Sequence, residues 1–274
     1  NPAVVCPDLD KVHRGLARED LFLCVHEQFM TETAAFADIV LPATMFLEHD
    51  DFYTASGHTS FQVARKVVEA PGECRENHYV ICELARRLGA SHPGFEMTPW
   101  EIMNETLRRS GMWDAQTNLD RGGQDHALPF ETAHFLDGFA WPDRKFRFKP
   151  DWSRLGGRWR EMPVLPDHFD VIDNASAEKP YRLVAAPART FLNSTFTETP
   201  GSLQREKQPT ALIHPDVCAS LGLANGDRVV LGNQRGEVTV QARAQDGQQR
   251  SVVVLEAPWP TTQFAGAVGA DRLF

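Results

Sequence analysis

Polar side chains that could do chemistry gather in three stretches of this 274-residue chain. Residues 26–33 carry a carboxylate at Glu27 and hydroxyl groups at Thr31 and Thr33. Residues 48–51 read Glu-His-Asp-Asp, and residues 189–195 combine a guanidinium group with amide and hydroxyl donors. Each stretch comes near the end of a predicted strand, and ligands of open α/β sheets bind beyond the carboxyl ends of strands. These three stretches are therefore the candidate sites.

The first stretch could bind a nucleotide. Glu27 could accept hydrogen bonds from the N–H edge of a guanine or from ribose hydroxyls. Thr31 and Thr33 stand where a helix is predicted to begin, so their hydroxyls and the free backbone N–H groups could meet a phosphate. The alternative is that Thr31 only caps the helix and that Glu27 is solvated.

The second stretch, residues 48–51 with His58 nearby, offers groups that could ligate a metal or act as acid and base. Consecutive residues point in different directions, however, so the run by itself does not define a site. A solvated, capping loop is the alternative, and we assign no metal ligand. A hydrolase that uses Glu48, His49 and Asp51 is a weaker rival function.

The third stretch follows the first strand predicted in the C-terminal part of the chain. Arg189 supplies a guanidinium group, and Asn193, Ser194 and Thr195 supply small amide and hydroxyl groups. Together they could wrap a pyrophosphate, because charge-assisted hydrogen bonds to phosphate oxygens are strong. An ordinary polar loop is the alternative.

Common catalytic motifs are absent from the sequence. It has no Gly-x-Ser-x-Gly elbow, no Gly-x-x-x-x-Gly-Lys loop, no His-Glu-x-x-His helix and no Gly-x-Gly-x-x-Gly fingerprint. We therefore assign no catalytic residue from the residues alone.

Composition excludes several classes of partner. The formal net charge is -9 and no basic run is present, which argues against a nucleic-acid surface because phosphate neutralisation needs clustered Lys and Arg. No apolar stretch approaches the roughly 20 residues that span a bilayer, so membrane insertion is not expected. With 42% hydrophobic and 24% charged residues, the chain has the composition of a soluble globular protein.

The five cysteines are scattered without a Cys-x-x-Cys pair. An odd number with no such pair indicates neither a zinc knuckle, an iron-sulfur ligand run nor a disulfide framework. Small apolar residues in a reducing cytosol are the favoured interpretation, so we expect a cytoplasmic protein. The chain begins without Met, at what resembles a strand end, which indicates a fragment of a longer polypeptide.

Residues 1–150 are predicted to form an incomplete α/β layer. Continuous apolar runs suit parallel strands that are covered on both faces, as in doubly wound sheets. The predicted helices span residues 8–18, 31–37, 77–88 and 98–109, and the predicted strands span residues 21–25, 39–41 and, weakly, 146–148. In the helix of residues 77–88 we expect one buried apolar stripe: Val80, Ile81, Leu84, Ala85 and Leu88.

Residues 180–274 are predicted to form a compact, mostly β barrel after a linker of residues 151–179. Pro163 to Pro166 belong to this linker. Turn dipeptides such as Asn225-Gly226 and Asp246-Gly247 separate the strands. The predicted strands span residues 181–186, 210–213, 228–231, 237–244 and 251–255, with one helix at residues 215–221.

Taken together, these stretches resemble the molybdopterin oxidoreductase superfamily, which includes formate dehydrogenases and dimethyl sulfoxide reductase. Residues 29–34 (FMTETA) and 37–43 (ADIVLPA), followed by Leu47-Glu48, are similar to the family signature. Residues 213–215 (IHP), 221–229 (LGLANGDRV) and 233–238 (NQRGEV) are similar to its dinucleotide-binding domain, a double-psi β-barrel. The resemblance implies a partial Rossmann-like α/β domain followed by that barrel.

The resemblance also implies a cofactor: molybdopterin guanine dinucleotide with molybdenum or tungsten. On one side the dinucleotide would contact Asn1, Glu27, Thr31, Thr33 and Asp38. From the barrel it would contact Arg189, Asn193, Ser194 and Thr195. The family's metal ligand and its 4Fe-4S segment lie upstream of the matched region, so the missing N-terminal half of the polypeptide is the implied partner, with an electron-transfer subunit as a possible further one.

One position near the end departs from the family pattern. The family often has Gly-hydrophobic-Asn-x-Leu-Thr where this chain has Gly269-Ala270-Asp271-Arg272-Leu273-Phe274. Asp271 cannot donate as an amide does and would face an anionic cofactor unfavourably, although its position still implies a cofactor contact. We expect the isolated chain to be catalytically inactive. The alternative to a fragment of an enzyme is a non-enzymatic nucleotide-binding or assembly module.

Overall fold

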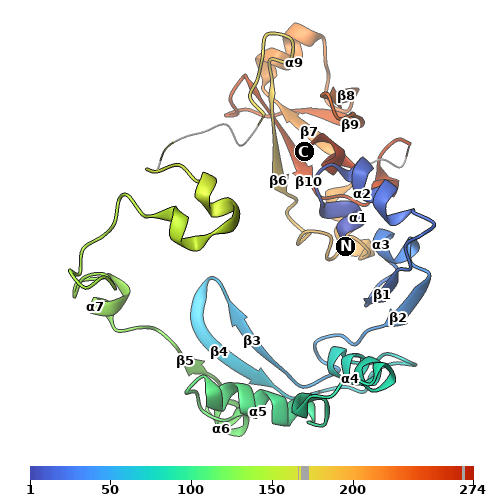
Figure 1. Cartoon of the computed structure of the whole chain (residues 1–274). Helices are drawn as coiled ribbons and strands as arrows, with labels where there is room; N and C mark the ends of the chain where they lie inside the picture. Colours follow the sequence, from blue (N-terminus) through green and yellow to red (C-terminus); the bar gives the residue numbers. More distant parts are fainter. Residues whose placement is uncertain (166, 168–172, 267–268) are drawn as a thin grey trace. The chain divides into compact units, whose positions relative to one another are not determined.

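The computed structural model describes residues 1–165, 167, 173–266 and 269–274, and they form two compact units (Figure 1). Unit 1 contains residues 1–45, 71–77 and 173–274, and unit 2 contains residues 46–70 and 78–172. Residues 1–45 thus group with the C-terminal part, a division that differs from the expected boundaries at 150 and 180. Part of the expected linker, including Pro166, lies outside the described residues.

The N-terminal part of unit 1 contains short helices and a two-stranded parallel sheet. Strands β1 and β2 pair from Cys24 opposite Ile39 to Glu27 opposite Pro42. Strand β1 begins three residues later than predicted, so Glu27 is its last residue. The elements are α1 (Pro2–Val5), α2 (Leu9–Leu16), β1 (Cys24–Glu27), α3 (Glu32–Ala35) and β2 (Ile39–Pro42).

A five-stranded mixed sheet forms the C-terminal part of unit 1, in the order β6-β10-β7-β9-β8. Strand β10 pairs in parallel with β6, and β7 pairs in parallel with β9, while the other two pairs are antiparallel. The predicted strands are confirmed with shifts of a residue or two at some ends. Their bounds are β6 (Arg182–Pro187), β7 (Thr210–Ile213), β8 (Arg228–Gly232), β9 (Glu237–Ala244) and β10 (Val252–Ala257).

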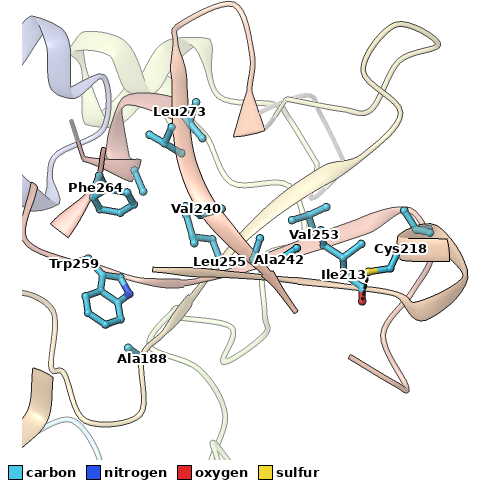
Figure 2. Packing of buried hydrophobic residues seen from close by; sticks show 14 of the residues in the cluster. Ala188, Ile213, Cys218, Val240, Ala242, Val253, Leu255, Trp259, Phe264 and Leu273 are labelled. Carbon is cyan, nitrogen blue, oxygen red and sulfur yellow. Dashed lines mark hydrogen bonds between the residues drawn. The ribbon is translucent and has the colours of Figure 1, made fainter. Parts of the chain in front are cut away.

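The strands β9 and β10 bury alternate residues, as one face of a sheet on a core requires. Leu255 and Ala211 are fully buried, and Trp259 and Phe264 close the core beyond β10 (Figure 2). Helix α9 (Pro215–Leu221) ends at Gly222, whose φ of 66° is the left-handed conformation of a helix C-terminus. The other helical elements here are α8 (Pro200–Glu206), which we did not predict, η4 (Thr261–Gln263) and η5 (Ala270–Leu273).

The N-terminal helices of unit 1 pack against its C-terminal end. Leu9 is buried, and a Cβ added at Gly269 would lie 2.8 Å from its Cδ2 atom. The backbone N–H of Asp8 donates to the carbonyl of Phe274 at 2.8 Å, and Arg272 forms an ion pair with Asp10. These contacts explain why residues 1–45 belong to the same compact unit as the five-stranded sheet.

Unit 2 is built around a hairpin that the sequence analysis missed. Strands β3 (Asp51–Ala55) and β4 (His58–Ala64) pair antiparallel, and β5 (Gln124–Asp125) adds to β4. Its core is small: Phe61, Val63, Leu107 and Ala115. The helical elements are α4 (Asn77–Leu88), η1 (Pro93–Phe95), α5 (Pro99–Arg109), α6 (Ala115–Asp120), α7 (Phe130–Ala133), η2 (Trp152–Leu155) and η3 (Gly157–Glu161).

Two expectations for unit 2 are wrong. Residues 146–148 form no strand and are irregular; the rings of Phe146 and Phe148 meet edge to face, with centroids 4.9 Å apart. Helix α4 has the predicted bounds, yet only Ala85 of its expected apolar stripe is buried. No helix among the described residues has the length and apolar character needed to cross a membrane.

Candidate functional site

The candidate site of unit 1 lies where strands β6 and β10 leave the five-stranded sheet. Because these strands are parallel, their carboxyl ends lie at the same edge. The N–H of Ala188 donates to the carbonyl of Ala257 at 3.0 Å, and this hydrogen bond holds the carboxyl ends of β6 and β10 side by side. The segments that follow, residues 188–195 and 258–264, therefore start from neighbouring points.

The segment after β6 is held by two contacts with the rest of unit 1 and by a turn within the segment. The ring of Phe191 is buried and meets Trp259 edge to face, with centroids 5.0 Å apart. The N–H and hydroxyl of Thr190 both donate to Glu206. Leu192 and Thr195 exchange two backbone hydrogen bonds that close a tight turn. The backbone is therefore fixed without the side chains of the predicted binding residues.

The predicted binding residues of this segment remain available. Arg189, Asn193 and Thr195 are exposed, and Ser194 is half-buried. Within the described residues, none of their side chains makes a hydrogen bond or ion pair. Asn193 has a φ of 50°, which an Asn tolerates better than most residues and which places it at the tip of the turn. One cation and three small polar groups thus line a fixed loop.

The N-terminus of α3 is joined to the segment after β10 by Glu32. One carboxylate oxygen of Glu32 accepts from the N–H of Thr261 at 3.0 Å, and the other accepts from the side-chain amide of Asn1 at 3.4 Å. Since Trp259 and Thr261 lie on one short segment, the loop of residues 189–195 and the start of α3 contact the same piece of chain.

The side chains of Asn1, Thr31 and Thr33 are engaged within the fold. The Asn1 side-chain oxygen accepts from both the N–H and the hydroxyl of Thr33, at 3.2 and 2.8 Å. The hydroxyl of Thr33 in turn accepts from the N–H of Ala3 at 3.0 Å. Thr31 is the N-cap of α3 and accepts from the N–H of Ala34 at 3.2 Å. The capping interpretation of Thr31 describes this geometry, and all three residues hold helices together.

The carboxylates of Asp38 and Glu27 differ in whether an oxygen atom is left for a ligand. Asp38 accepts from the N–H of Leu23 at 2.7 Å and so fastens the start of β1. Glu27 is half-buried at the end of β1, and one of its oxygens accepts only from the N–H of the next residue, Gln28, at 2.8 Å. Its other oxygen has no partner among the described residues, so Glu27 keeps a free acceptor.

Asp271 is a half-buried carboxylate in η5, and burial raises its pKa to about 6. Desolvation disfavours the charged form, and no neighbouring cation offsets it. Its neighbour Arg272 is committed to Asp10 and to the carbonyl of Glu237. The carboxyl group of Asp271 therefore takes up a proton more readily than that of an exposed Asp, but with a pKa of about 6 it is mostly charged near pH 7.

The acidic stretch of residues 48–51 comes just before the hairpin of unit 2, and only its last residue, Asp51, lies in β3. Asp50 accepts from the guanidinium of Arg65 at 2.9 Å and from the N–H of Lys66 at 2.8 Å, so it ties the ends of β3 and β4. His49 and Asp51 stand 3.6 Å apart and form a pair. Among the described residues no group of three His, Cys, Asp or Glu could hold a metal ion.

A separate pocket of about 190 Å³ lies on the five-stranded sheet. Its lining includes Arg228, Thr239 and the amide pair of Gln208 and Gln241. None of the ten predicted binding residues lines it. The donors described above are placed on an open edge, which suits an extended ligand better than an enclosed one.

Sequence reasoning missed the residues that position the site: Glu32, Glu206, Trp259 and Thr261. Glu32 stands between two threonines that were predicted binding residues, where an acid at the first turn of a helix is expected on electrostatic grounds alone. Its bond to Thr261 spans 229 positions in the sequence, and no local signal could have indicated it.

Two family models match the chain. The model described as molybdopterin oxidoreductase matches residues 1–87, and the model described as molydopterin dinucleotide binding domain matches residues 181–272. The chain is 33% identical over 293 residues to the probable oxidoreductase YoaE of Bacillus subtilis. The aligned region covers 100% of this chain and 40% of that protein.

Further similarity extends to a second relative and to a solved structure. A formate dehydrogenase subunit alpha of Methanocaldococcus jannaschii is 30% identical over 266 residues, which cover 93% of this chain and 37% of that protein. The structure of acetylene hydratase from Pelobacter acetylenicus matches with a TM-score of 0.74 and 24% identity over 97% of this chain and 38% of that one. The chain thus spans about 40% of the length of the relatives it matches.

Proposed function

The chain belongs to the molybdopterin oxidoreductase superfamily, and we propose that it is the portion of such an enzyme that grips a pterin guanine dinucleotide. One observation carries the proposal. The loop of residues 189–195 is fixed by Phe191 and Thr190, while Arg189, Asn193, Ser194 and Thr195 keep their hydrogen-bonding groups free. Donors that are oriented before binding lose little conformational entropy when a pyrophosphate arrives.

The chemistry of the donor set fits the anionic tail of such a cofactor. The net charge of -9 would repel a pyrophosphate at long range, so a local cation is required, and Arg189 is placed to supply it. Glu27 keeps one oxygen free for an N–H donor such as the edge of a guanine. Asn1, Thr31, Thr33 and Asp38 act by holding α1, α3 and β1 in place, which shapes the edge on which the nucleotide would lie.

The bound cofactor would supply two-electron chemistry at a molybdenum or tungsten ion, and this chain's share is to bind and orient it. We propose that the metal ligand and a 4Fe-4S cluster lie in an N-terminal half of the same polypeptide, that an electron-transfer subunit completes the enzyme, and that this chain alone is inactive. We also propose that the five-stranded sheet is a double-psi β-barrel. Its two parallel strand pairs, β6/β10 and β7/β9, support this proposal.

The test uses the longest reading frame that encodes this chain. The purified protein is assayed for bound metal and for guanine nucleotide released by acid. We expect both in the parent protein, and a loss of at least about tenfold in nucleotide retention in Arg189→Ala, since a charge-assisted pair contributes about 1.5–3 kcal/mol. Arg228→Ala, which removes an exposed guanidinium from β8 of the same sheet, is the matched control and should retain the nucleotide.

The outcome separates the two function classes. Absence of metal and nucleotide from the full-length protein would refute the proposal. A reading frame that begins shortly before residue 1, together with nucleotide binding but no metal, would instead favour the non-enzymatic binding module.

A further inference from the structure

Strands β8 and β9 carry polar side chains on the face of the sheet that is turned away from the core. Alternate residues of β9 are buried in the core, and Thr239 and Gln241 are the residues between them. Arg228 of β8 is directly opposite Gln241 in the strand register, and directly opposed residues of an antiparallel pair share a face. A guanidinium group, an amide and a hydroxyl group are therefore neighbours on this face.

These side chains line the pocket of about 190 Å³ described above. Gln208, which comes just before β7, and Gln263 of η4 are its further polar residues. All lining residues lie between positions 208 and 265, so the walls of the pocket belong to one compact unit. The shape of the pocket is therefore set by unit 1 itself.

The lining of the pocket is positively charged. Arg228 is the one charged residue in it, and its guanidinium forms no ion pair or hydrogen bond with any residue that the structure describes. Asp227, the acid next to it in the chain, accepts from the N–H of Ala224 at 2.8 Å. Because the net charge of -9 repels anions at long range, an anion site on this protein needs such a local cation. Charge complementarity therefore favours an anionic ligand.

The amides of Gln208 and Gln241 are oriented before any ligand binds. The Nε2 atom of Gln241 donates to Oε1 of Gln208 at 2.7 Å, and Nε2 of Gln208 donates in return to Oε1 of Gln241. Since an amide nitrogen carries two N–H groups, each keeps one donor after the pair has formed. The side chains of Thr239 and Gln263 make no hydrogen bond within the described part of the chain. Oriented donors beside a guanidinium group suit the oxygen atoms of an oxyanion.

The size of the pocket limits the ligand to a small molecule. Liquid water occupies about 30 Å³ per molecule, so the pocket corresponds to roughly six waters. Pockets for drug-sized ligands have volumes of about 300–1,000 Å³, so a dinucleotide would not fit. The proposed nucleotide contacts of the sheet lie in the loop after β6, and β6 and β8 are the outermost strands at opposite edges of the sheet. The pocket is therefore separate from that loop.

We propose that this pocket is a second ligand site of unit 1 and that it binds a small oxyanion, a phosphate or a carboxylate. The guanidinium of Arg228 would bind the charged oxygens, and the hydroxyl of Thr239 and the free amide N–H groups of Gln208 and Gln241 would complete the contacts. The proposal goes beyond the proposed function and does not depend on it, because none of these residues is a proposed nucleotide contact.

The test is isothermal titration calorimetry on the protein encoded by the longest reading frame that contains this chain. Inorganic phosphate and malonate are titrated separately at an ionic strength held constant with NaCl. We expect saturable binding of at least one probe with a Kd of about 1 mM or lower, which a ligand of this size can reach. The preferred probe distinguishes a phosphate from a carboxylate as the ligand, and either result supports the proposal.

Three variants test the contacts. Arg228→Ala should weaken binding at least about tenfold, because hydrogen bonds to charged groups are the stronger ones. Thr239→Val keeps the shape of the side chain and should weaken binding at least about twofold. Arg243→Ala removes the same charge from β9, two positions beyond Gln241 and outside the lining, and as the matched control it should leave binding unchanged. Thermal unfolding of each variant shows that it is folded.

The outcomes are separable from those of the cofactor proposal. Arg189→Ala should keep the oxyanion, and Arg228→Ala should keep the nucleotide, so either proposal can fail alone. Absence of saturable binding of both probes, as when a side chain of the full-length protein fills the pocket, would overturn the oxyanion site. Equal affinity in Arg228→Ala and the parent, or equal losses in Arg228→Ala and Arg243→Ala, would show attraction by surface charge alone. Loss of the nucleotide in Arg228→Ala would make the pocket part of the nucleotide site and would also overturn it.

Discussion

The carboxylate of Glu32 should be the most sensitive single group in the framework of the candidate site. It joins the start of α3 to the segment after β10 through the N–H of Thr261, and it also accepts from the side chain of Asn1. Thr261 is buried, so its N–H cannot turn to water when the carboxylate is removed. Glu32→Ala therefore tests whether this contact holds two remote parts of unit 1 together.

The expected magnitude follows from the groups left without partners. A buried N–H without an acceptor costs about 1–3 kcal/mol, and the weak 3.4 Å bond to Asn1 adds little, so we expect Glu32→Ala to lower the free energy of unfolding by about 2 kcal/mol. Glu32→Gln keeps an oxygen for Thr261 but turns an amide donor toward the amide of Asn1, which should cost roughly 0.5–1 kcal/mol. For a chain of this size, 2 kcal/mol lowers Tm by roughly 4–8 °C.

The assay is urea unfolding followed by circular dichroism, with thermal unfolding in parallel. Glu27→Ala is the control, because the carboxylate of Glu27 accepts only from its own neighbour, and it should change the unfolding free energy by less than about 0.5 kcal/mol. Equal midpoints for Glu32→Ala, Glu32→Gln and the parent chain would refute the reasoning, since the contact would then contribute nothing to stability.

Three further predictions concern the same unit. Burial raises the pKa of Asp271 to about 6 from an ordinary value of 3.8, so the folded chain holds the proton more tightly than the unfolded chain and loses stability as pH rises between these values. Asp271→Asn should therefore raise the free energy of unfolding by about 1 kcal/mol near pH 7, after allowance for solvent screening, and leave it unchanged near pH 4. Urea unfolding midpoints equal to those of the parent chain at both pH values would contradict this prediction. Gly269→Ala would place a Cβ 2.8 Å from Leu9 and should cost about 1–3 kcal/mol in urea unfolding, whereas an unchanged midpoint would mean that α2 moves freely. Phe191→Leu loses the edge-to-face contact with Trp259, so nucleotide retention by the full-length protein should fall as it does in Arg189→Ala; full retention would show that the loop needs no such anchor.

Local periodicity accounts for most of the elements that the sequence predicted well. Strand β9 alternates buried residues with more exposed ones over its first seven positions, and helix α9 begins at Pro215 and is followed by Gly222. Each of these signals depends on residues within a few positions of one another, so it can be read without knowledge of the tertiary fold.

The hairpin of unit 2 was missed although its signal was present. Ser56-Gly57 is a two-residue turn between segments that alternate aromatic or aliphatic residues with polar ones. The loop interpretation of residues 48–51 holds for Glu48, His49 and Asp50, whereas Asp51 is the first residue of β3. A polar cluster at a strand end is equally consistent with the strand itself.

The candidate site was predicted in part, and the division has a physical basis. Arg189, Asn193 and Thr195 could be chosen by residue type, because free donors on a loop need only be exposed. Asn1 and Thr33 could not be separated from them, since whether an amide or hydroxyl is free depends on a partner 32 positions away. Side-chain chemistry indicates what a residue can bind, and only the tertiary structure determines whether its groups are already engaged.

Helix α4 reverses the usual relation between sequence and structure. Its period predicts a covered apolar stripe, yet the rest of unit 2 leaves Ile81, Leu84 and Leu88 exposed. An apolar stripe on a helix usually packs against another apolar surface. The sequence of a helix therefore indicates that such a partner surface exists, even where the helix's own unit does not provide it. Burial of three such side chains is worth about 1.5–3 kcal/mol each, which is a large fraction of the stability of a typical domain. Covering these three side chains would therefore stabilise unit 2 substantially.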